Sequence, residues 1–161
     1  MTATRNSATK DSEPLSSTVD HLLEECRMVL PGIQALFGFQ LIAVFNQPFW
    51  DKFTDTQRVI HFMALSVIAV AIALVMTPAA YHRQAERESV SHGFVRLASR
   101  LLLWSMFPLL TGICLDFYLI ASLIFKSTEV GVALAALLSL TFFVLWFVLP
   151  RTTALQDYLR R

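Results

Sequence analysis

Four blocks of predominantly apolar residues, separated by short polar stretches, constrain the fold of this 161-residue chain more than any other feature. They cover residues 28–45, 60–81, 101–125 and 130–149. A helix rises about 1.5 Å per residue, so about 20 residues cross a hydrocarbon core about 30 Å thick. The blocks therefore predict an all-α polytopic membrane protein with a bundle of four transmembrane helices. The first block is short and contains Pro31, Gln34 and Gln40, so a re-entrant or interfacial segment is the alternative to a span there.

The segments outside the blocks divide the chain further. Residues 1–15 are rich in Ser, Thr and charged side chains, which predicts a disordered tail. The apolar residues Val19, Leu22, Leu23 and Cys26 then recur at helical spacing. They predict an N-terminal amphipathic helix, which either lies on the membrane surface or extends the first span. We expect residues 16–150 to form a single membrane domain and residues 151–161 a cytoplasmic tail.

The distribution of Lys and Arg predicts the orientation in the membrane. Of the 13 basic residues, all but Lys52, Arg58 and Lys126 lie in the two tails or in the stretch between the second and third blocks. Short loops that carry an excess of Lys and Arg face the cytoplasm. Both termini are therefore expected in the cytoplasm. The net charge of only +1 suggests no role in binding nucleic acid.

Asp116 is the only charged residue in the 101–125 block. A carboxylate at the centre of a bilayer costs about 2.5–3.5 kcal/mol on insertion scales, so it usually has a function or a polar partner. Counting about 1.5 Å per residue places Gln40, Ser66 and Ser139 in the same layer of the membrane. These four residues are candidates for a proton or monovalent-cation site. A structural hydrogen-bond clip between helices is the alternative for Asp116.

Two histidines flank the second block. His61 lies at its outer edge beside Arg58, where it can sense pH or be an interfacial residue without a role. His82 and Arg83 lie at its inner end, where they can bind anionic lipid headgroups or simply anchor the helix.

Motifs for enzymatic chemistry are missing from the sequence, so an enzyme is not expected, and neither is a cofactor. Cys26 and Cys114 are far apart and suggest neither a disulfide framework nor a metal site. The small residues Gly131, Ala135 and Ser139 are spaced by four, which lets another helix approach closely. Because four helices alone rarely enclose a permeation path, we expect a homo-oligomer surrounded by membrane lipids.

The segment EECRMVLPGIQALFGFQ, residues 24–40, and the segment PAAYHR, residues 78–83, carry a family resemblance. They resemble a family of small four-span bacterial integral membrane proteins of uncharacterised function, some of which are labelled sodium:proton antiporter. The resemblance implies a bacterial inner (plasma) membrane. It also implies a cluster of polar residues at the cytoplasmic ends of the first two spans, with an ion pair between Arg83 and either Glu24 or Glu25. We call this the inner-face cluster, and its members are Glu24, Glu25, Arg27, Gln34, His82 and Arg83.

The sequence thus favours ion or proton transport, by cation/proton exchange or by a channel-like oligomer. Asp116 would carry the ion, and the inner-face cluster would form a gate. The alternative is a membrane scaffold or regulatory subunit that transports nothing and binds a cytoplasmic partner or anionic lipid. Asp116 is not part of the motif that carries the family resemblance.

Overall fold

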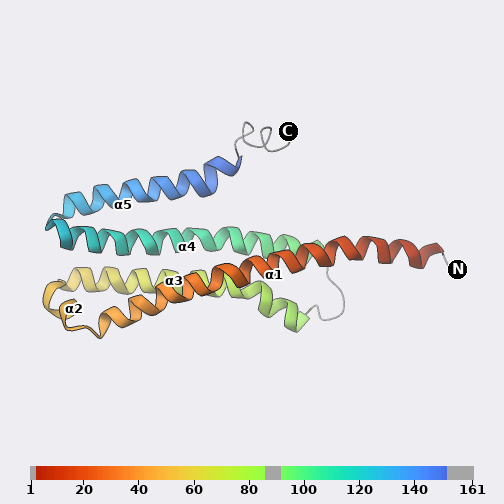
Figure 1. The fold of residues 1–161 in the computed structure, drawn as a ribbon, viewed down its shortest axis with the longest axis horizontal. Helices are drawn as coiled ribbons and strands as arrows, with labels where there is room; N and C mark the ends of the chain where they lie inside the picture. The colour runs from red at the N-terminus through yellow and green to blue at the C-terminus, as the bar shows by residue number, and fades with distance from the viewer. Residues whose placement is uncertain (1–2, 86–91, 152–161) are drawn as a thin grey trace. The chain divides into compact units, whose positions relative to one another are not determined.

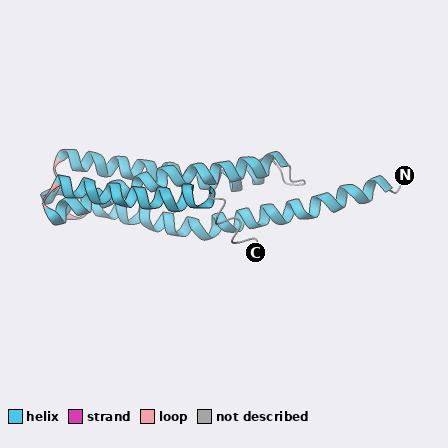
Figure 2. Ribbon diagram, turned by 90° about the horizontal axis from the view of Figure 1, so that it is seen from above, coloured by secondary structure: helices cyan, strands magenta, loops and turns pink. Residues whose placement is uncertain are grey.

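The computed structural model describes residues 3–85 and 92–151, which are almost entirely helical (Figures 1 and 2). The five α-helices are α1 (Ala3–Val44), α2 (Gln47–Lys52), α3 (Asp55–Ala85), α4 (His92–Phe125) and α5 (Thr128–Phe143). A π-helical turn (Val144–Val148) and a 3-10 turn (Leu149–Arg151) continue α5. The part of the chain that the structure describes contains no β-strand, in agreement with the all-α prediction.

Four helices are long and apolar enough to cross a membrane, as the apolar blocks predicted. The candidate spans are Val19–Val44, Asp55–Gln84, His92–Phe125 and Thr128–Arg151. The first is a continuous helical segment of 26 residues, which is long enough for a full span. Three of the four begin well before their apolar block, because the helices continue into polar flanking residues.

The chain divides into two compact units. Unit 1 comprises Met1–Leu41 and Ile68–Pro108, and unit 2 comprises Ile42–Val67 and Leu109–Arg161. Helices α1, α3 and α4 each contribute residues to both units. The prediction of one membrane domain over residues 16–150 stays a prediction.

The core of unit 1 joins the early part of α1 to the start of α4. Val19, Phe94 and Ala98 are almost fully buried, and Leu22 and Leu23 pack against them. The predicted amphipathic segment is therefore part of α1, and its apolar face packs on α4 residues. Among the described residues it is not a separate helix, which agrees with the alternative that it extends the first span. Residues 3–15 are also part of α1, whereas most of the tail 151–161 lies outside the described residues.

In unit 2 a very short turn joins α4 to α5. Lys126 takes a left-handed conformation with φ of 51°, and the hydroxyl of Ser127 accepts a hydrogen bond from the Val130 N–H at the start of α5. Gly131 is buried against Ser122, so closely that a β-carbon on Gly131 would lie 3.2 Å from the Ser122 β-carbon and backbone nitrogen. The end of α4 and the start of α5 therefore form a tight hairpin, and the glycine allows its close packing.

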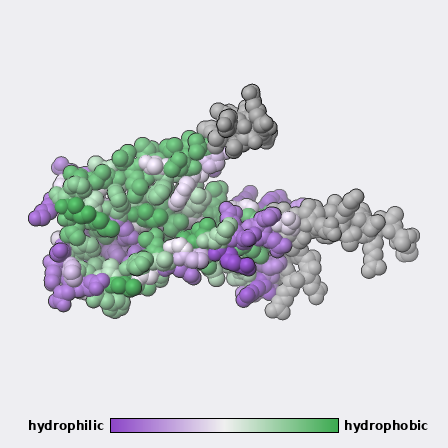
Figure 3. Space-filling view, viewed as in Figure 1, coloured by the Kyte–Doolittle hydropathy of each residue, from purple (hydrophilic) through white to green (hydrophobic). Residues whose placement is uncertain are grey.

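Most of the apolar surface of the candidate spans is exposed. Only 6% of the most apolar window in the last span is buried within the chain. The space-filling view shows hydrophobic side chains over α4 and α5 and hydrophilic ones gathered at their connecting turn (Figure 3). Contiguous apolar surface of this extent is rare on soluble monomers and is typical of helices that contact lipid or a partner.

Candidate functional site

Asp116 of α4 lies beside His61 of α3 in unit 2. The Nδ1 atom of His61 is 3.5 Å from Oδ1 of Asp116, which is an ion-pair distance when the imidazole is protonated. The two side chains are largely buried, with 8% of His61 and 17% of Asp116 exposed. The carboxylate that the sequence singled out therefore has a titratable partner, and that partner comes from another candidate span.

The local sequence explains why His61 faces inward. Positions 61, 64, 68, 71 and 75 follow the three- and four-residue spacing that lines up one face of a helix. Ala64, Ile68 and Ala71 on this face are completely buried, and Val75 is nearly so. His61 is the next position of the same buried stripe toward the start of α3.

The same argument holds for α4. Gly112 and Leu119 are buried, and Asp116 lies between them at the same helical spacing. A side chain at this position points to the buried face of the helix. On this face the structure places the imidazole of His61 next to the Asp116 carboxylate.

Helix α2 covers His61. The ring of Phe49, itself 8% exposed, lies 5.2 Å from the imidazole ring in an edge-on arrangement. Asn46 precedes α2, and a proline near its first turn favours helix formation there. The ring of Phe49 therefore separates His61 from the surface formed by this loop.

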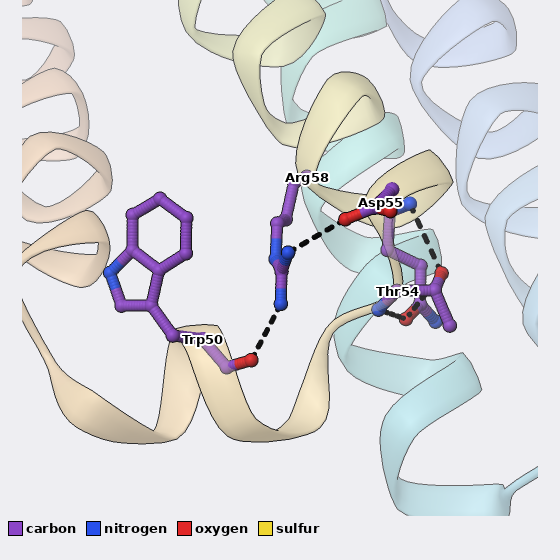
Figure 4. Close-up of polar contacts among 5 residues, drawn as sticks. Trp50, Thr54, Asp55 and Arg58 are labelled. Carbon is purple, nitrogen blue, oxygen red and sulfur yellow. Dashed lines mark hydrogen bonds and ion pairs between the residues drawn. The ribbon is translucent and has the colours of Figure 1, made fainter.

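An exposed polar network holds α2 against the start of α3 (Figure 4). Arg58 donates one hydrogen bond to the Trp50 carbonyl oxygen (2.6 Å) and another to Oδ1 of Asp55 (2.7 Å). Its guanidinium carbon also lies 5.1 Å from the centre of the Trp50 ring, a cation–π contact. Arg58 thus links α2 to α3 one turn before His61.

Thr54 caps α3 at its start. The Thr54 hydroxyl accepts from the Gln57 N–H (3.3 Å), and the Gln57 side chain accepts from the Thr54 N–H (2.9 Å). This reciprocal pair is a capping box. It sets the first residue of α3 at Asp55 and thereby places His61 almost two turns inside the helix.

The other three residues of the predicted polar layer have different surroundings. Ser66 is exposed, and its hydroxyl donates to the Phe62 carbonyl oxygen within α3 (2.8 Å). Ser139 lies within hydrogen-bonding reach of the Cys114 thiol in unit 2. Gln40 is buried and belongs to unit 1. Asp116 is therefore the member of the predicted layer that the structure places in a titratable pair.

The inner-face cluster is partly gathered around one cavity in unit 1. Arg27, His82 and Arg83 line it together with apolar residues of α1 and α3. Glu24, Glu25 and Gln34 are exposed residues of α1 and are not among those that line the cavity. The predicted ion pair of Arg83 with one of the two glutamates stays a prediction. Within the described residues, no group of three or more His, Cys, Asp or Glu side chains is arranged to hold a metal ion.

One family profile, described as a family of unknown function (DUF6328), matches residues 10–150. The chain belongs to this family. The matched range includes both the His61–Asp116 pair and the residues that line the cavity of unit 1. Comparisons with curated proteins and with solved structures found no significant match.

Sequence reasoning placed His61 at the membrane edge and missed it as the partner of Asp116. Two features of the sequence indicate that His61 lies on the buried face of its helix. One is the Thr54–Gln57 capping pattern, which moves the start of α3 away from His61. The other is the helical spacing that His61 shares with Ala64 and Ile68.

Proposed function

We propose that the protein is a multi-pass membrane protein that exchanges protons for a monovalent cation at the His61–Asp116 pair. The four candidate spans and their exposed apolar faces support the membrane location. The pair supports the chemistry. Ionisable residues within spans usually mark ion or proton pathways, and here a carboxylate and an imidazole meet between two spans.

The charge states of the pair favour proton exchange over a purely structural clip. With one proton shared between His61 and Asp116, the pair carries no net charge, whichever residue holds the proton. Without that proton the pair carries a net charge of −1, which is costly to bury unless a cation compensates for it. A proton and a monovalent cation therefore compete for the same site, which is the requirement for exchange. Histidine is well suited because its ordinary titration falls between pH 5 and 8.

The position of α2 supports the same proposal. Phe49 covers His61, while Asp116 keeps 17% of its side chain exposed. An exchanger must open its site to one side of the membrane at a time, and α2 is a short element whose movement would open this one. In the proposed orientation both termini face the cytoplasm of a bacterial inner membrane, so α2 faces the outside. A homo-oligomer remains part of the proposal, since a second copy would help to enclose a path.

Flux through proteoliposomes tests the proposal. A pH-sensitive dye inside the vesicles reports proton movement after a sodium or potassium gradient is imposed, with wild type compared to Asp116→Asn and His61→Gln. The first change keeps the size and hydrogen bonding of Asp116 but removes its titration. Asp51→Asn and His92→Gln are matched controls, because they make the same changes at exposed residues outside the pair.

We expect cation-driven proton flux in wild type and in both controls, and its loss in both variants of the pair. The exchanged variant, His61→Asp with Asp116→His, should recover part of the flux because it keeps both groups. Flux that persists in Asp116→Asn would show that the site lies elsewhere. Absence of wild-type flux under every gradient would refute transport and favour the alternative of a scaffold or regulatory subunit.

A further inference from the structure

The residues that line the cavity in unit 1 have no role in the proposed transport at the His61–Asp116 pair. It has a volume of about 250 Å³ and lies among residues of α1 and α3. Six neutral side chains form most of its wall: Leu23, Cys26, Leu30, Val75, Met76 and Ala79. The other three lining residues, Arg27, His82 and Arg83, are basic.

One polar atom at this cavity lacks a partner. The Nδ1 atom of His82 is buried and has no hydrogen-bond partner among the described residues. The ring of Phe94 lies beside the imidazole, with the two ring centres 5.6 Å apart. An unpaired buried polar atom is costly unless another group satisfies it, and a ligand with an oxygen acceptor would do so.

The size of the cavity limits what can fill it. Pockets that enclose a whole small molecule usually measure about 300–1,000 Å³, so this one is suited to part of a larger molecule. Its apolar wall would be left uncovered by a small inorganic anion. The neighbouring residues Met28 and Val29 on α1 are exposed and apolar, and they provide a surface on which a longer chain could continue.

We propose that this cavity binds an anionic phospholipid. The phosphate would lie against Arg27, Arg83 and His82, and the first part of an acyl chain would cover Leu30, Val75 and Met76. Arginine binds phosphate oxygens through charge-assisted, often bidentate hydrogen bonds. Basic pockets between membrane-spanning helices bind lipid headgroups in this way on the side that carries most Lys and Arg. The site is independent of the His61–Asp116 pair, so a failure of transport leaves it standing.

Lipid retention tests this proposal. The full-length protein is placed in nanodiscs of phosphatidylcholine that contain 10% phosphatidylglycerol, extracted into mild detergent, and weighed with its bound lipid by native mass spectrometry. Wild type is compared with Arg27→Gln, Arg83→Gln, the double variant, and Arg83→Lys. Arg96→Gln is the matched control, because Arg96 is an exposed arginine of α4 that does not line the cavity.

We expect wild type and Arg96→Gln to retain phosphatidylglycerol in preference to phosphatidylcholine. Each arginine near a lipid phosphate contributes about 1 kcal/mol, so each single variant should lower the ratio of bound to free phosphatidylglycerol about fivefold and the double variant about 25-fold. Arg83→Lys keeps the charge and should lose less than Arg83→Gln. Size-exclusion profiles and melting temperatures identify variants that do not fold. If the glutamine variants do not fold, the lipid retention of wild type is compared with that of Arg83→Lys.

Three results would overturn the proposal. The first is equal retention of phosphatidylglycerol by wild type and a folded double variant. The second is equal retention of phosphatidylcholine and phosphatidylglycerol by wild type. The third is displacement of the lipid by millimolar inorganic phosphate, which would identify a site for free phosphate in place of a lipid.

Discussion

The close contact of α4 and α5 at Gly131 leads to a quantitative prediction for the substitution Gly131→Ala. Gly131 is buried against Ser122, and an added β-carbon would clash with the Ser122 hydroxyl and lie 3.2 Å from its β-carbon and backbone nitrogen. The backbone cannot move aside as a flexible side chain can. Overpacking of this kind costs about 1–3 kcal/mol, while replacing a helical glycine by alanine gains up to about 1 kcal/mol. Gly131→Ala should therefore lower the free energy of unfolding by about 1 kcal/mol.

Ser122 is the partner for a double-mutant cycle. Its hydroxyl is buried and has no hydrogen-bond partner within the described part of the chain, so Ser122→Ala should be neutral or stabilising. In that background Gly131→Ala should cost less, because the nearest clashing atom is gone. We expect a coupling energy of about 1 kcal/mol between the two changes. The assay is unfolding by SDS titration in mixed detergent micelles, followed by helical circular dichroism.

Gly38 of α1 provides the control, because a β-carbon there would meet nothing within 4 Å. Gly38→Ala should raise the free energy of unfolding by up to about 1 kcal/mol through helix propensity alone. If Gly131→Ala stabilised the protein as Gly38→Ala does, the close packing of α4 and α5 would be wrong. A coupling energy near zero would show that Ser122 is not the residue in contact.

Three further predictions concern the loop end of unit 2. Phe49→Ala should speed the modification of His61 by diethyl pyrocarbonate relative to exposed His21, measured by mass spectrometry; an unchanged rate would mean that Phe49 does not cover the imidazole. Thr54→Ala should lower the free energy of unfolding by about 1 kcal/mol and Thr54→Ser should restore it, because the capping box needs a hydroxyl; equal stability would exclude the cap. Lys126→Gly should raise the free energy of unfolding by up to about 1 kcal/mol because the residue is left-handed, and Lys126→Val should lower it; the opposite order would contradict this turn.

The four candidate spans could be predicted from the sequence, because the length of an apolar block limits what it can form, whereas the short helix α2 was not predicted. The hairpin was also predictable, since the turn after Phe125 is too short for any other connection. The residues that pack against each helix could not be predicted from the sequence. Gly131 and Ser139 share a stripe of small residues, but only the packed structure shows Ser122 against the first and Cys114 beside the second. These contacts lie eight residues apart on both helices, as an antiparallel register requires.

The distance of His61 from the start of its helix depends on where that helix begins, and the apolar blocks could not give the first residue. Hydropathy started the second span at residue 60 and left His61 at its edge. The capping box at Thr54 starts α3 at Asp55, so His61 lies about 9 Å inside the helix, and Asp116 lies about 14 Å from the end of α4. The remaining difference of about 5 Å is within the reach of two side chains that lean along their helices. A polar residue next to an apolar block is therefore better counted from the helix cap than from the first apolar residue, because the cap decides whether it lies outside the membrane or faces a buried carboxylate.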